Sequence, residues 1–358
     1  MTISVASIRA KLETNERIDK QEAAWLFSTA SDSDLQMLSG IVRSRFHDSA
    51  SATYLLMRII NYTNVCVAKC DYCSFYRLPY SPDGYVRSKE WIFERIDELV
   101  AAGGDFFGFN GGFNPKLKLD YYVDLFSSIR EHYGDSIEFY ALTIVELIYI
   151  ARLSKLSIKE TLAHLKEAGV HWITGGGAEI LSDSFRQRHS PLKYTVAEYY
   201  QAQREILDAD MNTTATMVIG FDETLEERLD HLETLRTFQD DTGSGLFSFL
   251  CWTYKSYNNE LGGKEIEASE YLRHLAICRI YLDNFQHIRA SVLTQNQNAL
   301  KALHYGADDF DIPWEDEVTE MAGALIEKDV DKILNYARAE GFEPKYRKVA
   351  RKSLVSRV

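Results

Sequence analysis

Hydrophobic and polar positions follow two different periods along this chain. Short runs rich in β-branched and aromatic residues, typical of strands, alternate with longer segments whose apolar residues recur at helical spacing. The expected strands cover residues 53–63, 105–112, 136–142, 170–177, 212–220, 246–252 and 287–294, with a weaker eighth candidate at 307–312. Residues 1–50 carry helical spacing alone, so the pattern predicts a helical segment before an alternating region.

The ends of several expected helices are also marked in the sequence. In a capping box, a Ser or Thr before the first turn and a Glu three residues later satisfy each other's backbone N–H groups. Three pairs match this pattern: Ser157 with Glu160, Thr195 with Glu198, and Thr224 with Glu227. Glycines at 134 and 169 stand where helices are expected to end, as is common for glycine.

The regular alternation of strand and helix predicts an α/β fold, namely a TIM-type (β/α)8 barrel with helical N-terminal and C-terminal extensions. We expect an N-terminal helical extension over residues 1–50, the barrel over 51–312 and a C-terminal helical extension over 313–358. An open doubly wound sheet is the alternative, because periodicity alone does not distinguish the two architectures.

The composition narrows the class of partner. The 358 residues are 46% hydrophobic and 26% charged, and the net charge is −13, which argues against non-specific binding to nucleic acid or to an anionic membrane surface. We find no apolar run long enough to span a bilayer and no secretion signal at the N-terminus. We therefore expect a cytoplasmic protein with reduced thiols.

Chemically suggestive residues follow the expected strands directly. Three cysteines come after the first strand, two glycines (111–112) after the second, residues 175–179 after the fourth and residues 220–223 after the fifth. In a βα barrel these loops all open on the C-terminal face, where active sites lie. The sequence therefore predicts one site built from several loops.

Cys66, Cys70 and Cys73 form a C-x3-C-x2-C pattern, although the whole chain has only five cysteines. Three thiolates can hold a [4Fe–4S] cube and leave its fourth iron without a protein ligand. Alternatives are a structural zinc ion, which needs a fourth ligand, an electron carrier, which normally caps all four irons, and cysteines that are simply buried. We interpret Cys251 and Cys278 as core residues of this last kind.

With Tyr72 directly before the third cysteine, this loop resembles that of the radical S-adenosylmethionine (SAM) enzymes. The resemblance implies a [4Fe–4S] cluster and SAM as cofactors, cleavage of SAM to a 5′-deoxyadenosyl radical, and a reducing protein such as flavodoxin or ferredoxin as partner. It also implies that the segment VIGFDE (218–223) lies along the adenine. The cofactor-binding residues that it implies are Tyr72, Asn110, Gly111, Gly112, Glu179 and Gly220.

Longer stretches resemble the cyclic dehypoxanthine futalosine synthases of menaquinone biosynthesis. They include NYTNVCVAKCDYCSFYR (61–77), GGGAEIL (175–181) and TTATMVIGFDETLEER (213–228). The implied reaction removes a hydrogen atom from the ribose C4′ of dehypoxanthine futalosine, and the carbon radical attacks the benzoate ring of the same molecule. Aminofutalosine synthase and a deazaflavin synthase subunit share the shorter motifs, so these related enzymes are the alternatives.

The implied reaction also releases a proton and binds a small-molecule substrate. Candidate proton acceptors on the expected catalytic face are Glu223, Asp222 and His189, each of which can equally be an ordinary surface or capping residue. Candidates for substrate contact are Thr174, Gly175, Gly176, Gly177 and Ser291. The substrate carboxylate requires a cation or backbone donors, for which the candidate cations are Arg58, Arg77, Arg289 and Lys255.

Overall fold

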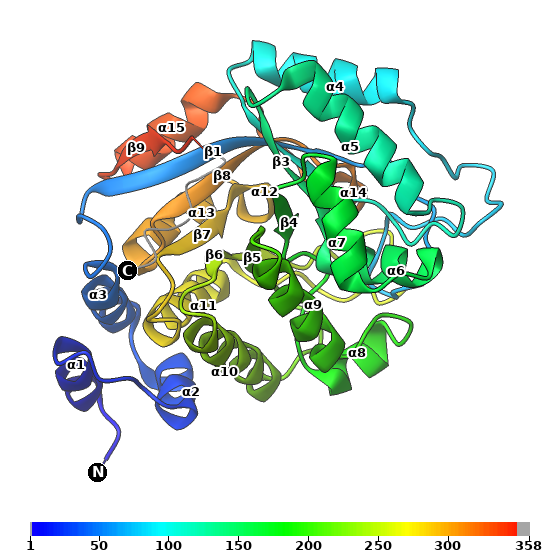
Figure 1. The fold of residues 1–358 in the computed structure, drawn as a ribbon. Helices are drawn as coiled ribbons and strands as arrows, with labels where there is room; N and C mark the ends of the chain where they lie inside the picture. Colours follow the sequence, from blue (N-terminus) through cyan, green and yellow to red (C-terminus); the bar gives the residue numbers. More distant parts are fainter. Residues whose placement is uncertain (1, 349–358) are drawn as a thin grey trace.

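The computed structural model describes residues 2–348, and its centre is a closed barrel of eight parallel strands (Figure 1). Neighbouring strands pair in chain order, and β8 pairs with β1 to close the barrel. The strands are β1 (Ser51–Ile60), β2 (Phe106–Phe109), β3 (Glu138–Thr143), β4 (Trp172–Thr174), β5 (Asn212–Ile219), β6 (Leu246–Thr253), β7 (His287–Ser291) and β8 (Asp309–Glu315). The predicted barrel is confirmed, and a strand lies in each expected segment.

Helices surround the barrel and connect successive strands (Figure 1). The longer connecting helices are α4 (Lys89–Ala101), α5 (Leu119–Tyr133), α6 (Ile144–Ser154), α7 (Ile158–Glu167), α8 (Asp183–His189), α9 (Val196–Asp208), α10 (Leu225–Asp241) and α11 (Ala268–Tyr281). Three short elements join β7 to β8: α12 (Val292–Gln295), α13 (Asn298–Lys301) and the 3-10 helix η1 (Ala302–Tyr305). The three predicted capping boxes are confirmed at the starts of α7, α9 and α10.

Apolar side chains fill two separate spaces, one outside the barrel and one inside it. Because successive side chains of a strand point to opposite faces, each strand contributes to both. The large outer core packs the strands against the helices. The inner cluster, here called the apolar plug, consists of Leu55, Phe106, Tyr140 and Trp172. Phe106 and Trp172 are the first residues of β2 and β4, so the plug closes the N-terminal end of the barrel.

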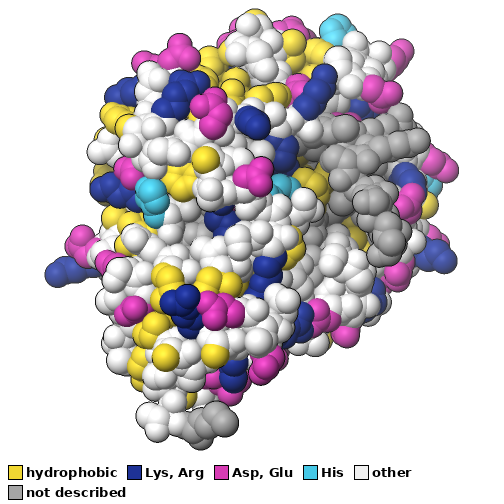
Figure 2. All heavy atoms as spheres, turned by 90° about the vertical axis from the view of Figure 1, so that its left-hand side faces the viewer, with side chains coloured by type: hydrophobic (Ala, Val, Ile, Leu, Met, Phe, Trp, Pro, Cys, Tyr) yellow, Lys and Arg dark blue, Asp and Glu magenta, His cyan; other side chains and the backbone are white. Residues whose placement is uncertain are grey.

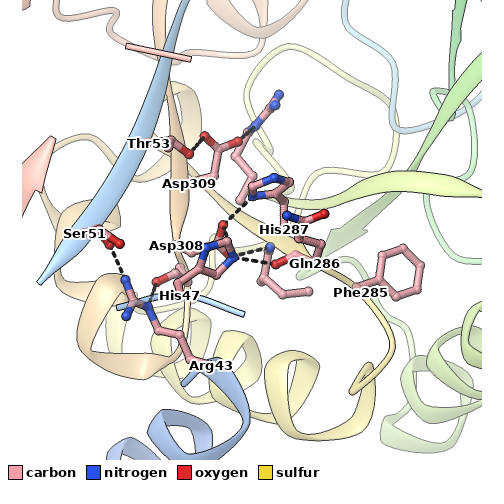
Figure 3. Close-up of polar contacts among 12 residues, drawn as sticks. Arg43, His47, Ser51, Thr53, Phe285, Gln286, His287, Asp308 and Asp309 are labelled. Carbon is pink, nitrogen blue, oxygen red and sulfur yellow. Dashed lines mark hydrogen bonds and ion pairs between the residues drawn. The ribbon is translucent and has the colours of Figure 1, made fainter. Parts of the chain in front are cut away.

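Three helices precede the barrel: α1 (Val5–Glu13), α2 (Lys20–Thr29) and α3 (Asp32–Arg43). They pack on its outside, with α2 and α3 against α11 (Figure 1). Arg43, at the end of α3, donates to the backbone carbonyls of Ala307 at 3.0 Å and Asp48 at 2.8 Å, and also to that of Ser51 (Figure 3). One side chain therefore fixes the end of α3 to the start of β1 and to the segment before β8.

Asp308, directly before β8, forms a second connection between the N-terminal helices and the barrel (Figure 3). One of its carboxylate oxygens lies 3.1 Å from Nε2 of His47, which follows α3, and 2.6 Å from Nδ1 of His287 in β7. The other oxygen accepts hydrogen bonds from the backbone N–H of Ile288 at 2.8 Å and from Arg279 of α11. We call His47, Arg279, His287 and Asp308 the Asp308 hub.

The C-terminal segment contains a strand as well as helices. Its elements are α14 (Glu317–Met321), α15 (Val330–Ala339) and β9 (Glu343–Tyr346), and β9 pairs in parallel with β1 from Ser51 to Tyr54. The sequence did not indicate this strand, because four residues that include a proline show no clear period. The division at residue 312 stays a prediction, and β8 runs past it to Glu315.

The surface mixes both signs of charge on the face that carries the N-terminal helices. Figure 2 shows Lys and Arg side chains interspersed with Asp and Glu on this face, with small hydrophobic groups between them. Within residues 2–348, no helix combines the length and the apolar composition that are needed to cross a membrane.

Candidate active site

Two adjoining cavities occupy the barrel on the C-terminal side of the apolar plug. The upper cavity, at the C-terminal ends of the strands, includes about 1290 Å³ of atom-free space, counting its open mouth. The lower cavity, deeper in the barrel, includes about 840 Å³ counted in the same way. The residues that line both cavities are Asn110, Thr143, Gly176, Thr216, Trp252 and Asp316. The lower space therefore adjoins the upper one.

The three cysteines predicted as metal ligands all line the upper cavity. Burial raises the pKa of each thiol, that of Cys70 to about 11, although the nearby charge of Lys193 opposes the shift. Burial therefore favours the protonated form of Cys66, Cys70 and Cys73. Metal ions bound to such thiols deprotonate them. Three thiols on the wall of a cavity, of which Cys70 is buried and the other two are partly buried, are therefore suited to bind a metal centre.

Backbone hydrogen bonds hold the first cysteine in place. The N–H of Cys66 donates to the carbonyl of Arg77 at 2.8 Å. The sulfur of Cys66 accepts from the backbone N–H groups of Ala68 at 3.4 Å and Phe113 at 3.2 Å. Because N–H donors favour the charged form of an acceptor, these two contacts favour a thiolate at this position.

The spread of the three sulfur atoms fits a cluster better than one zinc ion. Zinc–thiolate bonds of about 2.3 Å place the sulfurs around a single ion roughly 4 Å apart. Among residues 2–348, the group of three potential ligands whose donor atoms lie within 4.8 Å of one another is His47, His287 and Asp308, rather than the cysteines. Arg279 already neutralises Asp308 in that group, so we assign the Asp308 hub a structural role.

The turn after β2 packs tightly against the cysteine loop. A Cβ at Gly111 would lie 2.5 Å from the Tyr62 ring, and one at Gly112 would lie 2.4 Å from the carbonyl oxygen of Val65. Only glycine fits at such close approaches. Asn110 and Gly111 line the upper cavity, whereas Gly112 packs behind the cysteine loop.

Glu146, in the first turn of α6, fixes this turn and was not among the predicted site residues. Its Oε1 accepts from the N–H of Gly111 at 2.9 Å and from the Tyr62 hydroxyl at 2.5 Å. Its Oε2 accepts from the backbone N–H and the hydroxyl of Thr143, at 2.9 and 2.6 Å. Burial raises the pKa of Glu146, although these donors oppose the shift. The capping-box spacing of Thr143 and Glu146 was the sequence signal that could have found it.

Glu179 forms a largely buried ion pair in the lining of the upper cavity. The Lys193 ammonium lies 3.0 Å from both of its carboxylate oxygens and donates to the Tyr72 hydroxyl at 3.0 Å. Burial lowers the pKa of Lys193, but the charge of Glu179 outweighs it, so the net shift is upward and Lys193 stays a cation. No sequence signal marked Lys193, which stands in the loop between α8 and α9.

Aromatic rings form a further part of this wall. The Tyr72 and Phe221 rings lie 5.2 Å apart between centroids, and Phe221 lies 4.6 Å from Tyr254. All three residues line the upper cavity. Phe221 belongs to the segment expected along an adenine, and aromatic faces of this kind stack favourably on flat rings.

Several predicted site residues lie outside both cavity linings. Glu223 is buried, accepts from the N–H of Gly220 at 2.8 Å and pairs with Arg228 at 2.7 Å. His189 lies between two carboxylates, 2.9 Å from Asp71 and 2.7 Å from Asp222. The proposed proton-acceptor roles of Glu223, Asp222 and His189 therefore stay predictions, as does the proposed cofactor contact of Gly220.

The predicted substrate-contact residues divide between the cavities and the scaffold. Thr174 and Gly176 line the lower cavity, and Gly176 and Gly177 line the upper one. The carbonyl of Gly175 instead accepts from the Thr216 hydroxyl at 2.6 Å. The hydroxyl of Ser291 caps α12 by accepting from the N–H of Thr294 at 3.2 Å. Their roles in substrate binding stay predictions.

Comparison with known proteins decides the family. The sequence-family model of the radical SAM superfamily matches residues 60–235. The sequence-family model of the CofH/MqnC C-terminal region matches residues 243–354. A cyclic dehypoxanthine futalosine synthase of Halalkalibacterium halodurans is 34% identical over 348 residues, which cover 96% of this chain and 94% of that protein. The chain belongs to the radical SAM superfamily. Its cofactors are accordingly a [4Fe–4S] cluster and SAM, which the three thiols on the wall of the upper cavity fit.

Further relatives of this radical SAM protein match over most of its length. A cyclic dehypoxanthine futalosine synthase of Streptomyces coelicolor is 35% identical over 95% of this chain and 86% of that protein. An aminodeoxyfutalosine synthase of Thermus thermophilus is 32% identical over 88% of this chain and 86% of that protein. The crystal structure of methylornithine synthase (PylB) superposes with a TM-score of 0.71 and 15% identity, covering 94% of this chain and 97% of that one, and this likeness supports the fold.

The hydrogen bonds of Glu146 predict its effect on SAM binding in this radical SAM protein. The amide of a Glu146→Gln variant offers one acceptor oxygen in place of two, so it leaves the donors on Gly111 or on Thr143 unpaired. We expect SAM to bind roughly 10-fold more weakly and the free energy of unfolding to fall by about 1–3 kcal/mol. Equilibrium dialysis with SAM and urea unfolding measure the two effects.

The matched control is Glu160→Gln, which alters an exposed capping box at the start of α7, on the outside of the barrel. This variant is expected to bind SAM normally and to lose less than about 1 kcal/mol of stability. Equal SAM affinity in the Glu146 variant and the parent would contradict the positioning role.

Proposed function

We propose that this chain is a radical SAM cyclase that converts dehypoxanthine futalosine to cyclic dehypoxanthine futalosine in menaquinone biosynthesis. The observation that carries the proposal is the match to two cyclic dehypoxanthine futalosine synthases over 86% or more of their length. The model of the CofH/MqnC C-terminal region, which spans the last three barrel strands and the segment after them, supports the same assignment.

Each cavity supplies a different part of the proposed reaction. In the upper one, the three cysteines hold the cluster, Asn110 and Gly111 bind the methionyl end of SAM, and Glu179 faces its ribose. When bound, the reduced cluster and SAM supply a 5′-deoxyadenosyl radical, which gives off-pathway products unless the substrate lies beside it. The lower cavity, deeper in the barrel and shielded by the plug, holds the substrate folded on itself for intramolecular attack.

The atoms and electrons of the proposed reaction balance without an added oxidant. The substrate loses one hydrogen atom from ribose C4′ to the adenosyl group and forms one carbon–carbon bond to the benzoate ring. The cyclised radical then releases one electron and one proton. One electron is consumed in SAM cleavage and one is released by the cyclised radical. The protein therefore needs a reductant to start the reaction but no net oxidant.

An external protein supplies the first electron in this proposal. The two cysteines outside the trio, Cys251 and Cys278, are both buried, and two thiolates are too few to hold a second cluster for electron entry. A small reducing protein such as flavodoxin or ferredoxin fits this need. Unpaired thiols and a low-potential donor both fit the reducing cytoplasm.

Anaerobic turnover tests the function against its nearest rival. The related aminodeoxyfutalosine synthase leads to a product in which the adenosyl group is retained. We expect the reduced, cluster-loaded protein to form free 5′-deoxyadenosine and a cyclised product from dehypoxanthine futalosine, detected by liquid chromatography and mass spectrometry. Turnover that instead transfers the adenosyl group into a larger adduct would overturn the proposal in favour of the rival.

A further inference from the structure

Two buried side chains in the lower cavity each have an atom without a hydrogen-bond partner. Arg289 of β7 lies opposite Asp309 of β8 in the strand register, and Asp311 lies two pairs further on, opposite Ser291. The Arg289 and Asp311 side chains line the cavity, and the two residues are only 2% and 5% exposed. Among residues 2–348, Nη2 of Arg289 and Oδ1 of Asp311 find no partner. Since unpaired buried polar atoms are unfavourable, both atoms indicate a ligand.

The protein neutralises the Arg289 charge only in part. Its Nε donates to Oδ2 of Asp309 at 2.7 Å, but Nη2 of Arg347 donates to the same oxygen at 2.6 Å. Oδ1 of Asp309 accepts from the Thr53 hydroxyl at 2.7 Å (Figure 3). One carboxylate therefore serves two guanidinium groups, and the charge of the nearby Asp311 also acts on Arg289. Excess positive charge is left beside the cavity when Asp311 is protonated.

Asp311 is suited to change its protonation state when an anion arrives. Burial raises the pKa of Asp311 to about 6, although the nearby Arg289 opposes the shift. A second carboxylate beside it raises the pKa further, so the Asp311 acid becomes a hydrogen-bond donor.

The other charged and titratable groups around this cavity are Tyr140 of β3, Asp309 and Glu315 of β8, and Asp316 after it. Glu315 pairs with Arg58 at 2.5 Å, and Asp309 pairs with Arg347. The charge of each carboxylate is therefore already balanced by an arginine. Burial also raises the pKa of Asp316 to about 6. Asp316 lines both cavities and stands at their junction, after the end of β8, so it does not take the place of Asp311 beside Arg289.

The remaining walls indicate what is attached to the anion. Apolar and aromatic side chains face the cavity from several strands, including Met57 of β1, Tyr140 of β3, and Leu250 and Trp252 of β6. Such walls favour a flat apolar ring. A planar pair of acceptor oxygens on that ring matches a guanidinium donor and an adjacent acid.

We propose that Arg289 and Asp311 form an anchoring subsite for an aromatic carboxylate, in which Nη2 of Arg289 and the protonated Asp311 donate to the carboxylate oxygens. The inference rests on the proposed function for the identity of the ligand, the benzoate end of dehypoxanthine futalosine. Anchoring that end beside Arg289 directs the rest of the molecule towards the cysteine loop.

Benzoate binding to the full-length protein tests the subsite without catalysis. We expect calorimetry to show benzoate binding to the parent, and an Arg289→Gln variant to bind it about 10- to 100-fold more weakly. Arg289→Lys, which keeps the charge but not the planar fork, is expected to fall between the two. Benzamide, an uncharged probe of the same shape, should bind to the parent and to the Arg289 variants with similar affinity. Circular dichroism establishes that each variant is folded.

Asp311 gives the subsite a signature that a structural role would not produce. Because anion binding takes up one proton at Asp311, benzoate affinity of the parent should fall as the pH rises from 6 to 8, and Asp311→Asn should remove this dependence. The matched control is Lys166→Gln, which removes an exposed cation of α7 that lines neither cavity and should leave the benzoate affinity unchanged. Absent benzoate binding in the parent, or equal affinity in a folded Arg289→Gln variant, would overturn the subsite.

The outcomes for the subsite and for the proposed function are separable. A parent that cyclises dehypoxanthine futalosine, together with an Arg289→Gln variant of the same KM, would overturn the subsite and leave the function standing. Benzoate binding that depends on Arg289, in a cluster-loaded protein that does not cyclise this substrate, would support the subsite and overturn the function.

Discussion

Replacing any one of Cys66, Cys70 or Cys73 with alanine is expected to abolish SAM cleavage, with a loss of at least about 100-fold. Each thiol binds one iron of the proposed cube, so two ligands do not hold a stable four-iron cluster. Iron content should fall from about four atoms per chain to well below that number. Anaerobic reconstitution, iron analysis and the yield of 5′-deoxyadenosine measure the effect.

Cys251→Ala is the matched control for these variants. Cys251 is a buried core residue of β6, and its loss removes packing but no cluster ligand. This variant should keep its iron and its SAM cleavage. A Cys70→Ala variant that cleaves SAM as fast as the parent would refute the cluster assignment.

The second large effect is expected on stability, from Asp308→Ala. The carboxylate of Asp308 faces the Arg279 guanidinium, and both side chains are almost completely buried. Burial lowers the pKa of Arg279 to about 10 while Asp308 opposes the shift, so Arg279 is a cation at neutral pH in the parent. The variant removes the carboxylate that balances this buried charge. We expect the free energy of unfolding to fall by about 3–5 kcal/mol, measured by urea denaturation.

The control for this loss is Arg9→Ala, which removes an exposed ion pair with Glu13 in α1 and should cost less than about 1 kcal/mol. Equal stability losses in the two variants would contradict the role of the Asp308 hub. The site cavities lie on the other side of the plug, so SAM cleavage by the folded fraction should persist.

The same carboxylate predicts how stability depends on pH. Hydrogen bonds from His287 and His47 and the charge of Arg279 hold the pKa of Asp308 far below its usual range, against the effect of burial. A lowered pKa in the folded state stabilises the fold above the unfolded pKa of about 3.9, and this contribution is lost as the pH falls below it. Urea unfolding between pH 7 and pH 3 should show a steeper loss in the parent than in Asp308→Asn.

The barrel and the cysteine loop were predictable because their signals are local. Each strand has its own apolar run, and the three cysteines lie within eight consecutive positions. Arg289 was one of four candidate cations, but nothing local set it apart. Its significance depends on Asp309, Arg347 and Asp311, which only the closed barrel brings around it.

Single polar residues contributed by distant elements were the hardest to predict. Lys193 reaches Glu179 and Tyr72 from a loop whose sequence carries no motif. Glu146 was readable as a capping residue but not as the group that holds Gly111, because that contact joins α6 to the turn after β2. Such roles depend on contacts between elements that are distant in the sequence, and the spacing of apolar residues does not indicate these contacts.

The apolar plug has a consequence for kinetics. Because the plug closes one end of the barrel, the substrate and the product reach or leave the lower cavity through the upper cavity, which SAM is to occupy. We therefore expect an obligatory sequence, in which the substrate enters first and SAM follows. Methionine and 5′-deoxyadenosine then depart before the finished product does.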